Sequence, residues 1–237
     1  MATDKGELVL TSVHDEIQDG TRPLTEIVAD AIVNAVALGI LKPGQRLIEV
    51  DLANQLKVSR VPVREAIKIL QAQGIVKAVP NQGVRIALFD SLVVDQIVEA
   101  RIALEKIAAQ HALCVYTKEP RRIEKLNEIV MRMESAAKWL DWAELRKLDL
   151  AFHHEFCRAS GNEIVLSLWE ALARHITIIF GRELENEQNF PLVITQHQKL
   201  IQIFQGTKSN LDDEIQAHIT RLVNKTKNKL KPKQVKK

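Results

Sequence analysis

Four residues that can bind a divalent metal occupy core positions on predicted helices: Asp149, His153, His197 and His218. Asp149 and His153 are four residues apart, so both project from the apolar face of one helix. His197 and His218 each lie within the apolar stripe of a later helix. A single buried histidine is commonly satisfied by one hydrogen bond, but one carboxylate and three imidazoles together match the ligands of a divalent metal ion.

The elements that must position these residues follow two different patterns. In the first 90 residues, apolar periodicity and turn residues predict three helices and then two strands, at about 24–39, 50–55, 59–74, 75–79 and 84–88. Three helices followed by a β-hairpin is the order of a winged helix-turn-helix domain.

From Ser91 onward the strand signals end, and six amphipathic helices are predicted at about 91–116, 119–138, 141–159, 162–185, 191–206 and 210–229. We therefore expect a mainly α protein, with an N-terminal winged helix-turn-helix and a C-terminal all-α bundle of six helices. The expected parts are a flexible segment at 1–20, the winged helix-turn-helix domain at 21–89, the helical domain at 90–229 and a basic tail at 230–237.

The composition is that of an ordinary globular chain, because 46% of the 237 residues are hydrophobic and 27% are charged. The N-terminus carries acidic residues in place of the apolar run of a secretory signal, and no apolar segment reaches the roughly 18 residues of a membrane helix. Cys114 and Cys157 form no Cys-x-x-Cys motif, and Cys157 is predicted to be a small buried residue rather than a metal ligand. We expect a cytoplasmic protein that does not contact the membrane.

Positive charge is concentrated in two segments. Residues 40–89 carry eight Lys and Arg against three Asp and Glu, and residues 221–237 carry eight and none. The first segment includes Arg60 and Arg64, which lie one helical turn apart and can form paired hydrogen bonds with guanine or phosphate. This distribution favours a nucleic-acid partner. The basic tail is either a solvated appendage or an auxiliary contact.

A dense, ordered motif surrounds these arginines: Leu41-x-Pro43-Gly44-x-x-Leu47-x-Glu49-x-x-Leu52-Ala53-x-x-Leu56-x-Val58-Ser59-Arg60-Val61-Pro62-Val63-Arg64-Glu65-Ala66-x-x-x-Leu70-x-x-x-Gly74. It resembles the DNA-binding domain of the GntR family of bacterial transcription regulators. The resemblance implies that the helix beginning at Ser59 enters the major groove of double-stranded DNA and that the wing lies at the minor groove. The residues it assigns to DNA binding are Ser59, Arg60, Pro62, Arg64, Asn81, Gln82 and Gly83. Some members carry a further arginine on the second helix, which is missing from Ile48-Glu49-Val50-Asp51.

The pattern Asp149-x-x-x-His153, followed by His197 and His218 in an all-helical half, is similar to the FCD domain of the FadR subfamily of GntR regulators. Six helices in place of seven resemble its VanR-like branch. The resemblance implies that these four residues hold Zn²⁺, Ni²⁺ or Mn²⁺. It also implies that a small carboxylate effector completes the coordination from a cavity.

Arg101 shares the apolar stripe of the first C-terminal helix, so its guanidinium is predicted to point inward. The FCD resemblance implies that Arg101 binds the carboxylate of the effector. The alternative is an i,i+4 ion pair between Arg101 and Glu105. Asn162 and Arg174 are weaker candidates for effector binding, with helix capping, packing or surface exposure as alternatives. His154 is displaced around its helix from His153 and is expected to face solvent.

These features together predict a homodimeric DNA-binding transcription regulator, a repressor, that reads a palindromic operator and responds to a small carboxylate bound at the metal. One alternative is a regulator in which the ion itself is the signal. Another is a metal-dependent hydrolase. We do not expect an enzyme, because no further inward-facing Glu, Asp or His is predicted to serve as a general base.

Overall fold

The computed structural model describes residues 20, 22–186, 190–207 and 210–230. The predicted flexible segment at 1–20 and the basic tail at 230–237 therefore lie almost entirely outside the described residues. The chain divides into two compact units between Phe89 and Asp90, with Thr177–Arg182 grouped with the first unit.

The first unit contains the helices α2 (Leu24–Ala37), α3 (Glu49–Leu56) and α4 (Arg60–Ala72) and the strands β1 (Val76–Val79) and β2 (Gly83–Ile86). The strands pair antiparallel, with Val76 opposite Ile86 and Val79 opposite Gly83. Apolar side chains from all five elements form one core, which includes Val28, Ile32, Leu52, Val63, Leu70, Val76 and Ile86. This is the predicted winged helix-turn-helix order.

Two turns of the first unit need a left-handed backbone. Lys57, with φ 53°, ends α3 and redirects the chain toward α4. Asn81 and Gly83 have φ of 60° and 76° at the tip of the hairpin, which asparagine and glycine tolerate better than other residues. A Cβ at Gly83 would also lie 3.1 Å from Nε of Arg46. Glycine therefore gives the wing both its backbone conformation and its close contact with Arg46.

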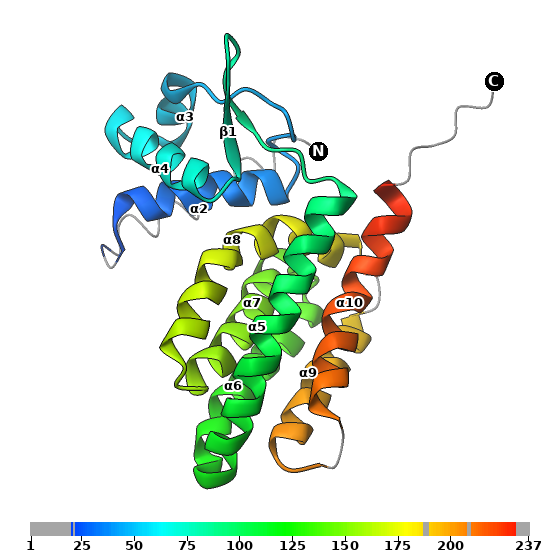
Figure 1. Cartoon of the computed structure of the whole chain (residues 1–237). Helices are drawn as coiled ribbons and strands as arrows, with labels where there is room; N and C mark the ends of the chain where they lie inside the picture. The colour runs from blue at the N-terminus through cyan, green and yellow to red at the C-terminus, as the bar shows by residue number, and fades with distance from the viewer. Residues whose placement is uncertain (1–19, 21, 187–189, 208–209, 231–237) are drawn as a thin grey trace, which may run out of the picture. The chain divides into compact units, whose positions relative to one another are not determined.

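The second unit consists of helices, which appear in Figure 1 from green to red: α5 (Ser91–Lys118), the 3₁₀ helix η1 (Pro120–Ile123), α6 (Glu124–Lys138), α7 (Trp142–Ala159), α8 (Glu163–Asn186), α9 (Phe190–Phe204) and α10 (Leu211–Leu230). Helix α7 packs against α5 and α6, while α10 packs against α5 and α9. The predicted fold class, mainly α with an N-terminal winged helix-turn-helix and a C-terminal helical domain, is confirmed. Among the described residues, no helix is long and apolar enough to cross a membrane.

Side chains at the helix starts explain where the helices of this unit begin. Asp90 accepts a hydrogen bond from the backbone N–H of Val93, 2.9 Å away, at the start of α5. Asp141 does the same for Glu144 at the start of α7, at 3.0 Å. Each carboxylate satisfies a backbone donor that has no partner within its helix and complements the positive end of the helix dipole.

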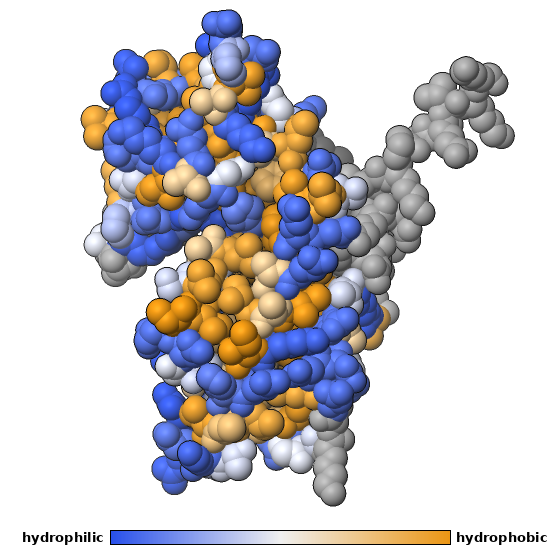
Figure 2. Space-filling model, viewed as in Figure 1, coloured by the Kyte–Doolittle hydropathy of each residue, from blue (hydrophilic) through white to orange (hydrophobic). Residues whose placement is uncertain are grey.

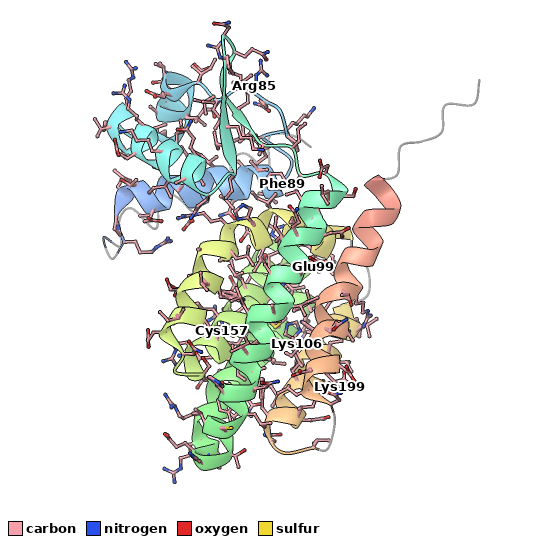
Figure 3. The ribbon with its side chains drawn as sticks, viewed as in Figure 1. Arg85, Phe89, Glu99, Lys106, Cys157 and Lys199 are labelled. Carbon is pink, nitrogen blue, oxygen red and sulfur yellow. The ribbon has the colours of Figure 1, made fainter. Side chains whose placement is uncertain are left out.

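Polar contacts on the surface hold α10 against its neighbours. Lys106 on α5 donates to Gln216 at 2.7 Å, and Lys199 on α9 forms a 2.6 Å ion pair with Glu214 (Figure 3). Apolar residues of α10, including Ile215 and Ile219, face the interior of the unit. This arrangement fixes which side of α10 points inward.

Candidate metal centre and nucleic-acid interface

The four residues predicted to bind a metal meet in the interior of the second unit, and we call them the Asp/His cluster: Asp149, His153, His197 and His218. Two come from α7, one from α9 and one from α10. One potential ligand atom from each lies within 4.8 Å of those of the others. Their exposed fractions are only 3%, 0%, 0% and 5%. Helical spacing explains this convergence, because each residue lies on the inward face of its helix.

Two histidines have one ring nitrogen fixed by an acceptor outside the Asp/His cluster. Nδ1 of His153 lies 2.8 Å from a carboxylate oxygen of Glu105, and Nδ1 of His197 lies 2.9 Å from the backbone carbonyl oxygen of Val193. An ionised carboxylate and a carbonyl can only accept hydrogen bonds, so Nδ1 carries the proton in both rings. The lone pair on Nε2 of each ring is then available to a metal.

The remaining contacts leave buried polar atoms unsatisfied. Nε2 of His153 lies 3.0 Å from Nε2 of His218, and Nε2 of His197 lies 3.2 Å from Oδ1 of Asp149. Among the described residues, Oδ1 of Asp149, Nε2 of His197 and Nδ1 of His218 are buried without a well-oriented hydrogen-bond partner. Such atoms are rare in folded proteins. One carboxylate and three imidazoles fit a divalent ion, which would satisfy the oxygen of Asp149 and the nitrogen of His197.

The environment favours the protonation states that bind metal. Burial lowers the pKa of His153, although Glu105 opposes this shift. Burial, together with His197 and His153, lowers the pKa of His218 well below its ordinary value. Burial alone would raise the pKa of Asp149, but the neighbouring histidines and Arg101 lower it to about 2. At neutral pH the buried imidazoles of His153 and His218 are therefore neutral and the carboxylate is ionised, as coordination requires.

Glu105, which the sequence indicated only as a possible partner of Arg101, also contacts His153 of the Asp/His cluster. Its side chain on α5 is fully buried, and it accepts hydrogen bonds from Nε of Arg101 at 2.7 Å and from Nε1 of Trp169 at 2.9 Å, besides its contact with His153. Burial alone would raise the pKa of Glu105, but the charges of Arg101 and His153 lower it to about 2. Glu105 is thus a further acid that points inward. Glu105 nevertheless has both oxygens engaged, so it is not positioned as a free general base.

Arg101 adopts the structural alternative considered from the sequence, an ion pair with Glu105 in which both side chains are at most 1% exposed. Oδ1 of Asn162 accepts a hydrogen bond from the backbone N–H of Val165 at 3.1 Å, so Asn162 caps α8. Arg174 is partly buried on α8. Neither Asn162 nor Arg174 belongs to the Asp/His cluster.

His154 and Cys157 lie outside the Asp/His cluster, as the sequence predicted. The side chain of His154 is 38% exposed and lies 2.9 Å from a carboxylate oxygen of Glu170 on α8. Cys157, which is labelled in Figure 3, is fully buried, and burial raises the pKa of its thiol.

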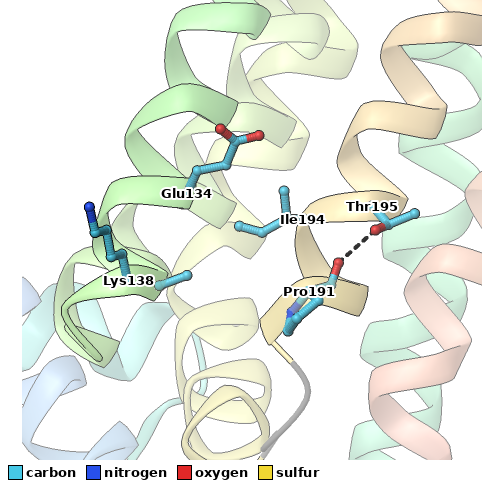
Figure 4. Close-up of a pocket in the computed structure, with 6 residues that line it drawn as sticks. Glu134, Lys138, Pro191, Ile194 and Thr195 are labelled. Carbon is cyan, nitrogen blue, oxygen red and sulfur yellow. Dashed lines mark hydrogen bonds between the residues drawn. The ribbon is translucent and has the colours of Figure 1, made fainter.

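A pocket opens between α6 and α9, apart from the Asp/His cluster (Figure 4). Its volume is about 500 Å³, and it is lined by Glu134, Ala137, Lys138, Pro191, Ile194 and Thr195. His197 lies on the same helix, one turn beyond Ile194, but it is buried and does not line the pocket. The cluster itself is therefore enclosed by protein in this structure.

The residues at the start of α4 divide into exposed and buried sets. Ser59 occupies the N-cap position with an extended backbone, and the side chains of Arg60 and Arg64 are 59% and 52% exposed. Pro62 is buried inside the domain, so it offers little surface for the contact with DNA that the resemblance implies. The difference follows from helical geometry, because Pro62 faces away from Arg60 and Arg64.

Both arginines approach one carboxylate on the preceding helix. Arg64 donates to Glu49 through Nε at 3.2 Å and Nη2 at 3.1 Å, while Nη2 of Arg60 lies 3.7 Å from Glu49. The hydrogen bond with Arg64 lowers the pKa of Glu49, against a smaller opposing effect of burial. At the wing, Asn81, Gln82 and Gly83 are all exposed.

Comparison with known proteins agrees with both units. Residues 24–86 match the gntR family of bacterial regulatory proteins, and residues 96–221 match the FCD domain. The chain is 30% identical over 135 residues to the Nta operon transcriptional regulator of Aminobacter aminovorans, covering 57% of this chain and 63% of that protein. The match thus spans less than two thirds of that relative.

A second relative is the gluconate operon transcriptional repressor of Bacillus subtilis, which is 26% identical over 192 residues, or 75% of this chain and 78% of the relative. The solved structure of E. coli McbR/YncC superposes with a TM-score of 0.70 and 22% identity, covering 89% of this chain and 98% of that one, which shows a shared fold. The relatives named here are regulators rather than enzymes. The chain belongs to the GntR family of bacterial regulatory proteins and carries an FCD domain in its C-terminal half.

Proposed function

We propose that this protein is a homodimeric transcription regulator, a repressor, whose affinity for a palindromic operator is controlled by a small carboxylate bound at a divalent metal. The observation that carries the proposal is the buried Asp/His cluster, with its unsatisfied ligand atoms, in a chain that also has a winged helix-turn-helix. A repressor is favoured by the name of the Bacillus subtilis relative, the gluconate operon transcriptional repressor.

Residues 21–89 would bind DNA through α4 and the wing. Arg60 and Arg64 are exposed on one face of α4, and each can offer a planar, bidentate guanidinium to a guanine edge or a phosphate. Ser59, Asn81, Gln82 and Gly83 are exposed and could contact the sugar-phosphate backbone or the minor groove. Glu49 must release the two arginines when they reach DNA. The free-energy cost of breaking these ion pairs is small, because exposed ion pairs contribute only about 0–1 kcal/mol to stability.

Residues 90–229 would hold the metal and its ligand. Asp149, His153, His197 and His218 would bind the ion, and when bound the ion supplies positive charge and coordination positions to an anionic ligand. One carboxylate and three neutral imidazoles neutralise one of the two metal charges, which leaves a site that attracts a carboxylate. The metal is proposed to be Zn²⁺, Ni²⁺ or Mn²⁺, all of which accept nitrogen and oxygen ligands.

Arg101, Asn162 and Arg174 remain proposals for contacts with the effector. Nε of Arg101 already donates to Glu105. Arg101 would therefore contact the carboxylate of an effector through Nη1 or Nη2. Asn162 would have to leave its capping position at α8. Arg101 is therefore the strongest of the three, because it can act without giving up its present ion pair.

A homodimer would place two α4 helices at the two halves of a palindrome. Figure 2 shows apolar side chains gathered over α5 and α8 on the viewed face of the helical unit. Exposed apolar residues on these helices include Leu92, Ile107, Ile164 and Leu168, with exposed fractions of 43–72%. A large exposed apolar area favours contact with another protein surface, and we propose a second copy of this chain.

A second candidate function is that of a metal sensor, in which the ion itself is the signal. The observation that favours it is the enclosure of the Asp/His cluster, whose members are at most 5% exposed. An ion fits such a site without a further opening, whereas a carboxylate ligand requires space beside the metal.

The test is the fluorescence anisotropy of a labelled duplex, selected from random sequences by the protein itself. The protein is used metal-free, metal-loaded, and metal-loaded with a panel of mono-, di- and tricarboxylates. We expect the affinity to change only when metal and one of the acids are both present, and His197→Ala to abolish that response. A change with metal alone would support the metal sensor, and failure to select any duplex would overturn the proposal of DNA binding.

A further inference from the structure

We propose that Glu105 is the positioning residue of the metal site, because it sets the tautomer of His153 and thereby the affinity for the ion. This inference rests on the metal site proposed above and deepens it. The geometry that carries it is a single chain of buried contacts that joins Arg101 and Trp169 to Glu105, then Glu105 to His153, and His153 to the remainder of the Asp/His cluster.

The two oxygens of Glu105 have separate roles. Oε1 accepts hydrogen bonds from Nε of Arg101 at 2.7 Å and from Nε1 of Trp169 at 2.9 Å. Both donors come from buried side chains, so they hold the carboxylate in one orientation. Oε2 is left to face Nδ1 of His153 at 2.8 Å. The position and direction of the second oxygen are therefore fixed by α5 and α8 before any metal binds.

The consequence for His153 follows from the chemistry of imidazole. A neutral ring carries one proton, and an acceptor at Nδ1 places that proton on Nδ1. Nε2, which faces Nε2 of His218 at 3.0 Å, then has its lone pair directed into the Asp/His cluster. With the opposite tautomer, a proton on Nε2 would occupy the direction in which His153 must coordinate. Glu105 thus prepares the ligand rather than binding the ion itself.

The same argument explains why a carboxylate is needed at position 105 and an amide would fail. In Glu105→Gln, the carbonyl oxygen would remain with the two donors on Arg101 and Trp169, and the amide NH₂ would face Nδ1 of His153. That NH₂ group donates, so Nδ1 would have to accept and the proton would move to Nε2. Turning the amide over would restore the acceptor at His153 but place two donors against the NH₂ group.

Glu155 provides a matched control on α7. It is also buried, at 7% exposed, and lies two residues from His153 in sequence, but its carboxylate pairs with Arg158 at 2.7 Å. Glu155 belongs neither to the Asp/His cluster nor to the contacts of Glu105. Glu155→Gln therefore changes a buried carboxylate near the site without altering any acceptor of a ligand histidine.

The experiment measures metal affinity and histidine tautomers in the full-length protein. Zn²⁺ affinity is measured by competition with a chromophoric chelator for wild type, Glu105→Gln and Glu155→Gln. The tautomer of His153 is read in the metal-free proteins from long-range proton–nitrogen correlation spectra, assigned by the signals that His153→Asn lacks. We expect wild type and Glu155→Gln to carry the proton on Nδ1 and to bind equally well. Glu105→Gln should carry it on Nε2 and lose roughly 10- to 100-fold in affinity.

Two results would overturn the role of Glu105: a proton on Nε2 in metal-free wild type, or equal affinities and tautomers in wild type and Glu105→Gln. The wild-type spectrum keeps the test decisive even if Glu105→Gln does not fold. If wild type binds no metal, the proposed metal site fails, but the tautomers still decide whether Glu105 positions His153. A loss of affinity shared equally by Glu155→Gln would also count against a specific role.

Discussion

Replacing Arg101 with methionine should destabilise the helical unit strongly. Arg101 and Glu105 are 2.7 Å apart with side chains 1% and 0% exposed, so methionine would leave a buried carboxylate without its cationic partner. Breaking a buried pair in this way costs about 3–5 kcal/mol. For a protein of this size, each kcal/mol corresponds to about 2–4 °C in Tm, so we expect the Tm to fall by roughly 6–20 °C.

Arg132→Met is the matched control, because Arg132 pairs with Glu144 at the same distance, 2.7 Å, but with side chains 66% and 34% exposed. Such a pair contributes about 0–1 kcal/mol. Both variants and wild type are melted in metal-free buffer and followed by far-ultraviolet circular dichroism. If Arg101→Met melts as high as Arg132→Met, the Arg101–Glu105 pair does not support the fold and the reasoning from burial is refuted.

Three further predictions concern DNA and pH. Arg64→Ala should weaken operator binding by about 1–3 kcal/mol per half-site without changing the melting curve; unchanged anisotropy at fixed salt would refute its role. Glu49→Gln should tighten binding to nonspecific DNA, because it removes the negative charge beside Arg60 and Arg64; equal or weaker binding would contradict this. Burial lowers the pKa of His153 and His218, so the unfolded chain takes up protons first as pH falls below about 6.5. The free energy of unfolding of the metal-free protein, measured by denaturant titration, should therefore be highest above that pH and fall below it. A free energy of unfolding that does not change with pH would contradict the presence of buried, neutral imidazoles.

The Asp/His cluster was predictable because it depends on helical periodicity within single elements. Asp149 and His153 share the inward face of α7, and His197 and His218 replace apolar residues on the inward faces of α9 and α10. The order of elements was predictable for the same reason, since turn residues and caps such as Asp90 mark where helices begin. Apolar periodicity therefore indicated both the fold class and which polar side chains point inward.

The contacts between helices were not predictable in this way. The sequence suggested a contact of Glu105 with Arg101, four residues earlier, but its contacts with His153 and Trp169 span 48 and 64 residues and depend on tertiary packing. The available signal is the i,i+4 spacing of Arg101 and Glu105, which indicates an ion pair as one of two alternatives for Arg101. The motif groups Pro62 with Arg60 and Arg64, and only the structure separates the buried face of α4 from the exposed one.

The binding of a divalent ion by the Asp/His cluster is tested most directly by metal content. Wild type, His197→Ala and His154→Ala are dialysed to equilibrium against Zn²⁺, Ni²⁺ or Mn²⁺, and bound metal is measured by plasma emission spectroscopy. His197 lies in the cluster, whereas His154 is paired with Glu170 on the surface. We predict one ion per chain in wild type and His154→Ala and a large loss in His197→Ala. Equal metal content in wild type and His197→Ala, or none in wild type, would contradict the proposed metal centre.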